Sequence, residues 1–147
     1  MNELNAFEIL LVEDNPQDAD LTIRGMKKHN LANKLHLVED GAEALDFVYS
    51  RGKYEHRKSC AQPKVIFLDL KLPKVSGLDV LRQLKGNEKT RPIPVVIVTS
   101  SCEDPDIKQA YALGANSYVV KPVDFDKFQE SITQLGLYWL VVNEPPR

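Results

Sequence analysis

The chain has 147 residues, of which 43% are hydrophobic, so it is long enough for one domain with a full core and too short for a second domain of similar size. Its 19 basic and 21 acidic residues give a net charge of −2, which argues against a nucleic-acid partner. No apolar run approaches the roughly 20 residues of a membrane span, and the first residues lack the basic segment of a signal peptide. We therefore expect one cytoplasmic domain over residues 1–147.

Short apolar runs alternate with segments of helical periodicity, which predicts βα units and a parallel sheet. The predicted strands cover residues 9–12, 34–39, 65–68, 95–98 and 118–120. Helices are predicted from Pro16 after an Asp14 or Asn15 cap, over 41–51, after a Ser76 cap, from 104–105 and from about 124. The polar connection 52–63 exceeds the usual length of roughly 2–6 residues for such loops, which is typical of functional or disordered segments.

Chemically capable side chains follow four of the five predicted strands. Glu13 and Asp14 come after the first strand, Asp69 after the third, Thr99 after the fourth and Lys121 after the fifth. Because the carboxyl ends of parallel strands meet at one edge of a sheet, we expect these side chains to converge there. Unrelated helix caps and loop acids would explain any one of these positions, but they explain the whole set poorly.

Three carboxylates at one edge repel one another, by about 4 kcal/mol for a pair ~4 Å apart at an effective dielectric near 20. A hard divalent cation relieves this repulsion, and Mg²⁺ binds a few carboxylate oxygens together with water and phosphate oxygens. The ammonium of Lys121 and the hydroxyl of Thr99 are groups that contact a phosphoryl group. The pattern therefore indicates a Mg²⁺ site for phosphoryl chemistry.

Four motifs resemble the receiver domain of two-component response regulators, and they follow the family's order and spacing along nearly the whole chain. They are Leu11–Asn15, Phe67–Pro73 with Gly77, Val98–Ser100 and Tyr118–Pro122. The resemblance implies a flavodoxin-like, doubly wound α/β fold with a five-stranded parallel sheet and five helices. It also implies that the protein catalyses only its own phosphorylation and dephosphorylation. Because 147 residues are too few for a receiver plus an output domain, we expect a stand-alone receiver.

The resemblance assigns roles to individual positions. Asp69 corresponds to the aspartate that accepts a phosphoryl group from a phosphohistidine of a sensor histidine kinase or phosphotransfer protein. The remaining positions correspond to the acidic pair that binds Mg²⁺ (Glu13 and Asp14), the backbone carbonyl that completes the metal site (Lys71), the phosphate-binding lysine (Lys121), and the switch threonine and aromatic residue (Thr99 and Tyr118). The family also makes a cis Lys121–Pro122 peptide plausible.

The predicted last helix continues beyond the core, which we expect to span about residues 7–136. Its apolar stripe comprises Phe125, Phe128, Ile132, Leu135, Trp139 and Val142. The extension 137–147 carries further apolar residues off this stripe, Leu137, Tyr138, Leu140 and Val141. We interpret it as a homodimer surface; the alternative is that it folds back on its own domain. The aromatic end and the long loop around Tyr54 resemble response regulators that partner phytochromes, which implies a light-sensing kinase.

Three other classes compete with this interpretation. A haloacid-dehalogenase-type hydrolase also forms an aspartyl phosphate, but it needs an acid where this chain has Lys71. A flavodoxin-like FMN carrier needs a phosphate loop after the first strand, where Glu13 and Asp14 would repel phosphate. The residues alone do not distinguish a phosphorylated receiver from one that only binds partners. Cys60 and Cys102 show no metal-ligand spacing and are expected to be reduced thiols.

Overall fold

The computed structural model describes residues 8–31, 34–57, 62–121 and 124–144, with the backbone alone at Phe125. Five parallel strands form one sheet in the order β2–β1–β3–β4–β5. The strands are β1 (Ile9–Val12), β2 (Leu35–Val38), β3 (Val65–Leu68), β4 (Val95–Thr99) and β5 (Ser117–Val120). The helices are α1 (Pro16–Lys27), α2 (Gly41–Tyr49), α3 (Gly77–Gly86), α4 (Asp104–Ala112) and α5 (Phe125–Leu137). The predicted fold class is thus confirmed.

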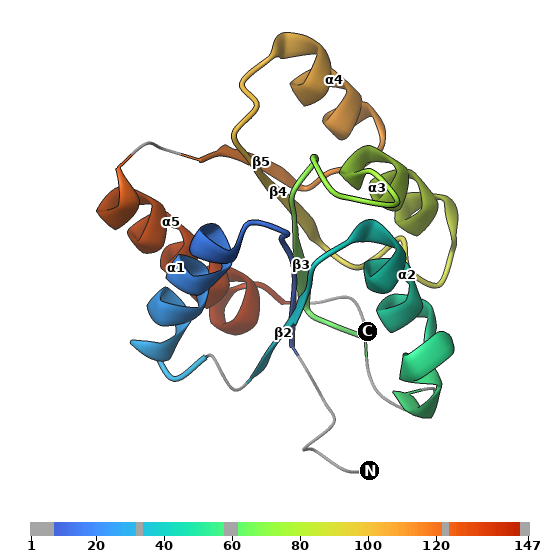
Figure 1. Ribbon diagram of the computed structural model, residues 1–147, viewed down its shortest axis with the longest axis horizontal. Coiled ribbons are helices and arrows are strands. Elements are labelled where there is room, and N and C mark those ends of the chain that lie inside the picture. Colours follow the sequence, from blue (N-terminus) through green and yellow to red (C-terminus); the bar gives the residue numbers. More distant parts are fainter. Residues whose placement is uncertain (1–7, 32–33, 58–61, 122–123, 145–147) are drawn as a thin grey trace.

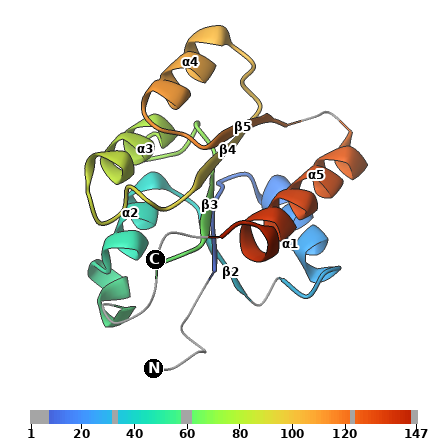
Figure 2. The same ribbon diagram turned by 180° about the vertical axis from the view of Figure 1, so that it is seen from behind.

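Helices cover both faces of the sheet, with α1 and α5 on one face and α2, α3 and α4 on the other (Figures 1 and 2). Residues of β1 and β3 alternate between two cores: Leu10 and Ile66 pack with α2 and α3, whereas Ile9 and Phe67 pack with α1 and α5. This two-sided burial explains why the strands read as continuous apolar runs. Each fully buried apolar side chain of this kind contributes about 1.5–3 kcal/mol to the free energy of folding.

Side-chain caps fix three helix starts close to where the sequence predicts them. The Asn15 side chain accepts hydrogen bonds from the N–H groups of Gln17 and Asp18, which resolves the choice between the two possible caps of α1. Ser76 caps α3 and Asp124 caps α5 in the same way. These caps matter for function because each one sets where a helix begins beside the carboxyl edge of the sheet.

Helices α1 and α5 pack closely because glycine lies at their contact. A Cβ atom on Gly25 would come within 2.5 Å of Thr133 Oγ1, and one on Gly136 within 2.7 Å of Met26 Cε. This contact joins the carboxyl-terminal helix to the helix that follows β1.

Along the described residues, no helix combines the length and the apolar composition needed to cross a membrane.

Two details of the core differ from the sequence-based expectations. The spacing of Ile107, Ala110 and Leu113 predicts one buried stripe along α4, but only Ala110 is fully buried. The reason is that α4 covers the edge strand β5, where there is less of the sheet to pack against. The connection after α2 is partly ordered as a 3₁₀ helix, η3 (Gly52–Arg57), which buries Tyr54. Cys60 lies outside the described residues.

The end of the chain also corrects an expectation. After Leu137 the helix continues as a π-helical turn, η4 (Tyr138–Val142), closed by the Asn143 N–H donating to the Tyr138 carbonyl at 2.6 Å. A π turn holds more residues than an α turn, so positions beyond it no longer follow the 3.6-residue period. Val142, expected on the core stripe, is therefore 68% exposed, whereas Leu140, expected off it, packs against the core.

Candidate functional site

The strand ends place the predicted residues at one edge of the sheet. Glu13 and Asp14 follow β1, Asp69 follows β3, Thr99 ends β4 and Lys121 follows β5. The register aligns these ends, because Val12 pairs with Leu68 and Thr99 with Val120. The Lys121 N–H also donates to the Thr99 carbonyl at 2.8 Å, which extends the β4–β5 ladder to the site. The predicted convergence of these strand ends is confirmed.

Lys121 is the centre of the cluster. Its Nζ lies 2.7 Å from Glu13 Oε1, 2.8 Å from Asp18 Oδ2 and 2.8 Å from Asp69 Oδ2. The Lys121 side chain is only 11% exposed, so these contacts are largely shielded from solvent. An ammonium group has three N–H donors, and here each one has a carboxylate to donate to.

Burial and charge act on the titration of this cluster in opposite directions. Burial raises the pKa of Glu13 to about 7, although the hydrogen bond from Lys121 lowers it, and the nearby charge of Asp69 raises it further. Burial lowers the pKa of Lys121, but hydrogen bonds to the three carboxylates outweigh burial and raise it above its ordinary value. Lys121 is therefore a permanent cation, whereas Glu13 changes its charge near neutral pH.

Asp69 is nearly buried, and both of its carboxylate oxygens are held. Oδ2 accepts from Lys121, and Oδ1 accepts from the Lys71 backbone N–H at 3.1 Å. The loop after Asp69 passes against Gly77, whose N–H donates to the Leu70 carbonyl at 2.9 Å. A Cβ atom at Gly77 would collide with the Asp69 carbonyl oxygen and lie 2.5 Å from the Leu70 Cα atom. Glycine at this position thus allows the loop after Asp69 to rest on the start of α3.

Three carboxylates form a group that suits a metal ion. Glu13, Asp14 and Asp69 each place one oxygen so that all three lie within 4.8 Å of one another. Glu13 and Asp69 are buried and Asp14 is exposed, so the group opens to solvent on the Asp14 side. An all-oxygen donor set with access for water fits the preference of Mg²⁺. Lys71 lies two residues after Asp69 in the chain. The role of its backbone carbonyl as a further metal ligand stays a prediction.

Thr99 and Tyr118 lie next to the cluster. Thr99 is fully buried, and its Oγ1 accepts a long hydrogen bond from the Ser101 N–H at 3.4 Å. The Tyr118 hydroxyl donates to the Ser101 carbonyl at 2.9 Å, and its ring lies 6.5 Å from that of Tyr111 on α4. One loop residue, Ser101, therefore contacts both predicted switch residues. The Lys121–Pro122 peptide extends beyond the described residues.

Asp18 belongs to the cluster, although the sequence analysis did not select it. It lies in the first turn of α1, four residues after Asp14, and contacts Lys121 at 2.8 Å. A usable signal was present in the sequence. A helix that starts four residues after the end of a strand presents its first turn at the same edge of the sheet, so an acid there can reach the site.

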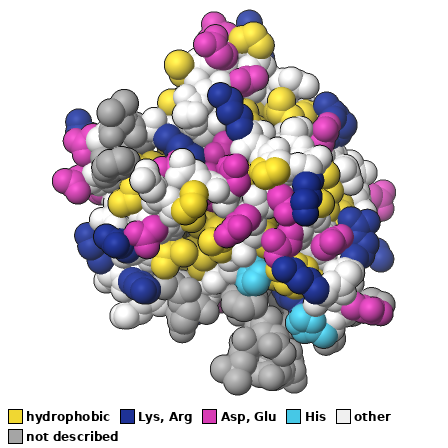
Figure 3. Space-filling model, viewed as in Figure 1, with side chains coloured by type: hydrophobic (Ala, Val, Ile, Leu, Met, Phe, Trp, Pro, Cys, Tyr) yellow, Lys and Arg dark blue, Asp and Glu magenta, His cyan; other side chains and the backbone are white. Residues whose placement is uncertain are grey.

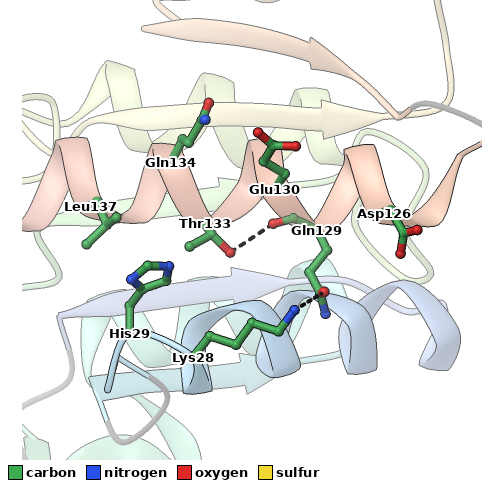
Figure 4. A pocket seen from close by; sticks show the side chains of 8 residues that line it. All are labelled: Lys28, His29, Asp126, Gln129, Glu130, Thr133, Gln134 and Leu137. Atoms are coloured by element: carbon green, nitrogen blue, oxygen red, sulfur yellow. Dashed lines mark hydrogen bonds between the residues drawn. The ribbon is translucent and has the colours of Figure 1, made fainter.

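A hollow lies between the end of α1 and α5, and none of its lining residues belongs to the carboxylate cluster. Seven of its eight lining residues are polar or charged, and Figure 4 shows Lys28 reaching across to Gln129, with a 3.0 Å hydrogen bond between their side chains. Acidic and basic side chains are interspersed on the face shown in Figure 3. The carboxylate cluster therefore remains the part of the described structure with the clearest chemistry.

Comparison with known proteins assigns the class. Residues 9–133 match the family model of the response regulator receiver domain, so the chain belongs to this family. This assignment sets aside the hydrolase and FMN-carrier interpretations. Among curated relatives, the probable methanogenesis regulatory protein FilR2 of Methanothrix harundinacea is 37% identical over 95% of this chain and 88% of its own. Response regulator Rcp1 of Synechocystis is 33% identical, over 90% of this chain and 88% of its own.

Solved structures narrow the resemblance to regulators that partner phytochromes. The phosphorylated cyanobacterial phytochrome response regulator RcpA superposes with a TM-score of 0.89 at 30% identity, covering 97% of this chain and 99% of its own. The bacteriophytochrome response regulator AtBRR is 48% identical, with a TM-score of 0.73 and coverage of 95% and 99%. Rcp1 in its Mn²⁺-bound form superposes with a TM-score of 0.86 at 32% identity, over 95% and 98%. The chain is thus a receiver domain that resembles phytochrome-partner response regulators.

Proposed function

We propose that this receiver accepts a phosphoryl group on Asp69 from a phosphohistidine of a sensor histidine kinase or phosphotransfer protein. The observation that carries the proposal is the 2.8 Å contact between Lys121 Nζ and Asp69 Oδ2, beside the carboxylate group of Glu13, Asp14 and Asp69. That arrangement supplies a nucleophilic carboxylate, a fixed cation and an oxygen-donor metal site. The phosphorylated state of RcpA and the Mn²⁺-bound state of Rcp1 support it by analogy.

The transfer is a displacement at phosphorus. An oxygen of Asp69 forms the new O–P bond while the P–N bond to the donor imidazole breaks, and the electron pair stays on the leaving nitrogen. Glu13, Asp14, Asp69 and the Lys71 carbonyl would hold Mg²⁺, which would supply positive charge next to the transferring group. The ammonium of Lys121, which now donates to Asp69, donates to a phosphoryl oxygen afterwards. The phosphoryl group carries roughly −1.5 to −2 charges near neutral pH. The Asp69 carboxylate loses its own negative charge when its oxygen bonds to phosphorus, so the net gain of negative charge is smaller than for a phosphorylated hydroxyl.

The switch follows from the contacts of Ser101. When the Thr99 hydroxyl moves towards the phosphoryl group, the loop that starts at Thr99 moves in the same direction. Because the Tyr118 hydroxyl donates to the Ser101 carbonyl, a shift of this loop breaks or moves that hydrogen bond. Tyr118 then turns towards the space that Thr99 leaves, and the surface formed by α4, β5 and α5 changes.

The partner surface lies at the end of the chain, in residues 137–144. Val141 is 71% and Val142 68% exposed, and Tyr138 is also exposed. Exposed apolar residues grouped on one turn favour association, and we assign this turn to a homodimer. The 48% identity with a bacteriophytochrome response regulator favours a phytochrome-like kinase as the phosphodonor.

Intact-mass measurement tests the proposal. The protein is incubated with Mg²⁺ and acetyl phosphate or phosphoramidate, and we expect one added phosphoryl group that is stable to acid and labile to base. Asp69→Asn should show none, while Asp20→Asn, which removes an exposed acid of α1, should label like the parent. A parent protein that gains no phosphoryl group would identify it as a receiver that acts by binding alone.

A further inference from the structure

Lys121 has one carboxylate partner that the metal group does not include. Of its three partners, Glu13 and Asp69 belong to the group of oxygens within 4.8 Å of one another, and Asp18 does not. When a cation occupies that group, the oxygens of Glu13 and Asp69 are shared with it. When Asp69 carries a phosphoryl group, one of its oxygens is bonded to phosphorus. Asp18 is the partner that neither event removes.

The position of Asp18 is fixed by its own backbone. Its N–H donates to Asn15 Oδ1 at 3.1 Å, and its carbonyl accepts from Thr22 Oγ1 at 2.9 Å. The side chain is 20% exposed, so the contact with Lys121 is partly shielded from solvent. Helix α1 therefore presents the Asp18 carboxylate to Lys121 from a well-held first turn.

We propose that Asp18 is a positioning residue that keeps the Lys121 ammonium directed at the phosphoryl group once Mg²⁺ has engaged Glu13 and Asp69. The inference rests on the proposed phosphorylation of Asp69 and adds to it a residue outside the metal group. Without Asp18, Lys121 has only Glu13 and Asp69 to donate to, so it competes with the cation for them. Two other roles are distinguishable: Asp18 as a metal ligand, and Asp18 as an acid that stabilises only the start of α1.

A double-mutant cycle separates these roles. Four proteins are compared, namely the parent, Asp18→Asn, Lys121→Met and the double variant, by labelling rate with acetyl phosphate and by Mg²⁺ titration calorimetry. We expect Asp18→Asn to slow labelling about tenfold, because roughly one charge-assisted hydrogen bond is lost. We also expect this variant to bind Mg²⁺ more weakly. In the Lys121→Met background the same change should have little further effect. Asp18→Glu should restore part of the rate, and Asp20→Asn, on the same helix, should change neither value.

Other outcomes overturn the inference. Equal loss of Mg²⁺ affinity on both backgrounds would make Asp18 a ligand. Equal loss of labelling on both backgrounds, with a matching fall in melting temperature, would make its role structural. If the Asp18→Asn variant is labelled at the parent's rate, Lys121 does not need the contact with Asp18. If the parent itself is not labelled, the proposed function fails, and the four Mg²⁺ titrations still decide whether Asp18 acts through Lys121.

Discussion

The ammonium of Lys121 and the carboxylate of Glu13 lie 2.7 Å apart, although they follow strands β5 and β1, which are separated in the sheet by β3 and β4. This ion pair spans the carboxyl edge of the sheet above the end of β3, where Asp69 lies. A cation that enters the carboxylate group must therefore share Glu13 with Lys121. The occupancy of the site is thereby tied to the charge of Glu13.

The first prediction concerns pH. Because burial raises the pKa of Glu13 to about 7, this side chain is protonated in the metal-free protein below that value and deprotonated above it. Metal binding requires the deprotonated form. We expect the apparent Mg²⁺ dissociation constant to rise by up to about tenfold for each pH unit below 7 and to level off above it. Calorimetric titrations at several pH values measure this, and Glu13→Gln should bind weakly with a flatter profile. A parent affinity that is constant between pH 6 and about 8 would contradict the prediction.

The second prediction concerns Asp14, which is exposed and makes none of the three contacts with Lys121. Asp14→Ala should weaken Mg²⁺ binding by about 10–100-fold, whether the carboxylate binds directly or through water. The metal-free protein should be as stable as the parent, because the Lys121 cluster is intact. Calorimetry and thermal unfolding without Mg²⁺ report the two properties separately. Binding at the parent's affinity would give the acidic pair another role.

The third prediction concerns Gly77. Gly77→Ala places a methyl group against the Asp69 carbonyl and the Leu70 backbone, so the loop after Asp69 must shift. We expect a loss of roughly 1–3 kcal/mol in the free energy of unfolding, as in overpacked cores, together with slower labelling of Asp69. Gly86→Ala is the matched control, because a Cβ atom there meets nothing within 4 Å. Denaturant unfolding of both variants decides the matter, and equal stabilities would contradict the close approach.

The fourth prediction concerns the proposed dimer. Val141 and Val142 are exposed, whereas Leu140 packs on its own core, so the informative change is Val141→Glu with Val142→Lys. We expect a monomer whose stability is within about 0.5 kcal/mol of the parent's, as for surface substitutions. Light scattering with and without phosphodonor gives the masses. A parent that is monomeric at high concentration in both states would assign this turn another role.

Much of the site was accessible from the sequence because it depends on local patterns. The runs that end at Val12, Leu68 and Val98 are apolar throughout, which predicts buried parallel strands, and parallel strands deliver the residues that follow them to one edge. That geometry places Glu13, Asp69 and Lys121 together with no knowledge of the side-chain packing. Helix starts at Asn15 and Ser76 follow from capping chemistry, which is also local.

The remaining features depend on contacts between segments far apart in the chain. Asp18 joins the site only because the side chain of Lys121 reaches the first turn of α1, 103 residues away in sequence. The π turn after Leu137 exchanges the environments of Leu140 and Val142, which a 3.6-residue period cannot anticipate. Tyr54 is buried because its hydroxyl meets Glu43 of α2 and His36 of β2. The sequence by itself thus determined the sheet and which residues reach its edge, while the tertiary packing decided which partners those residues have, because an ion pair or buried hydroxyl is set by the distance between elements.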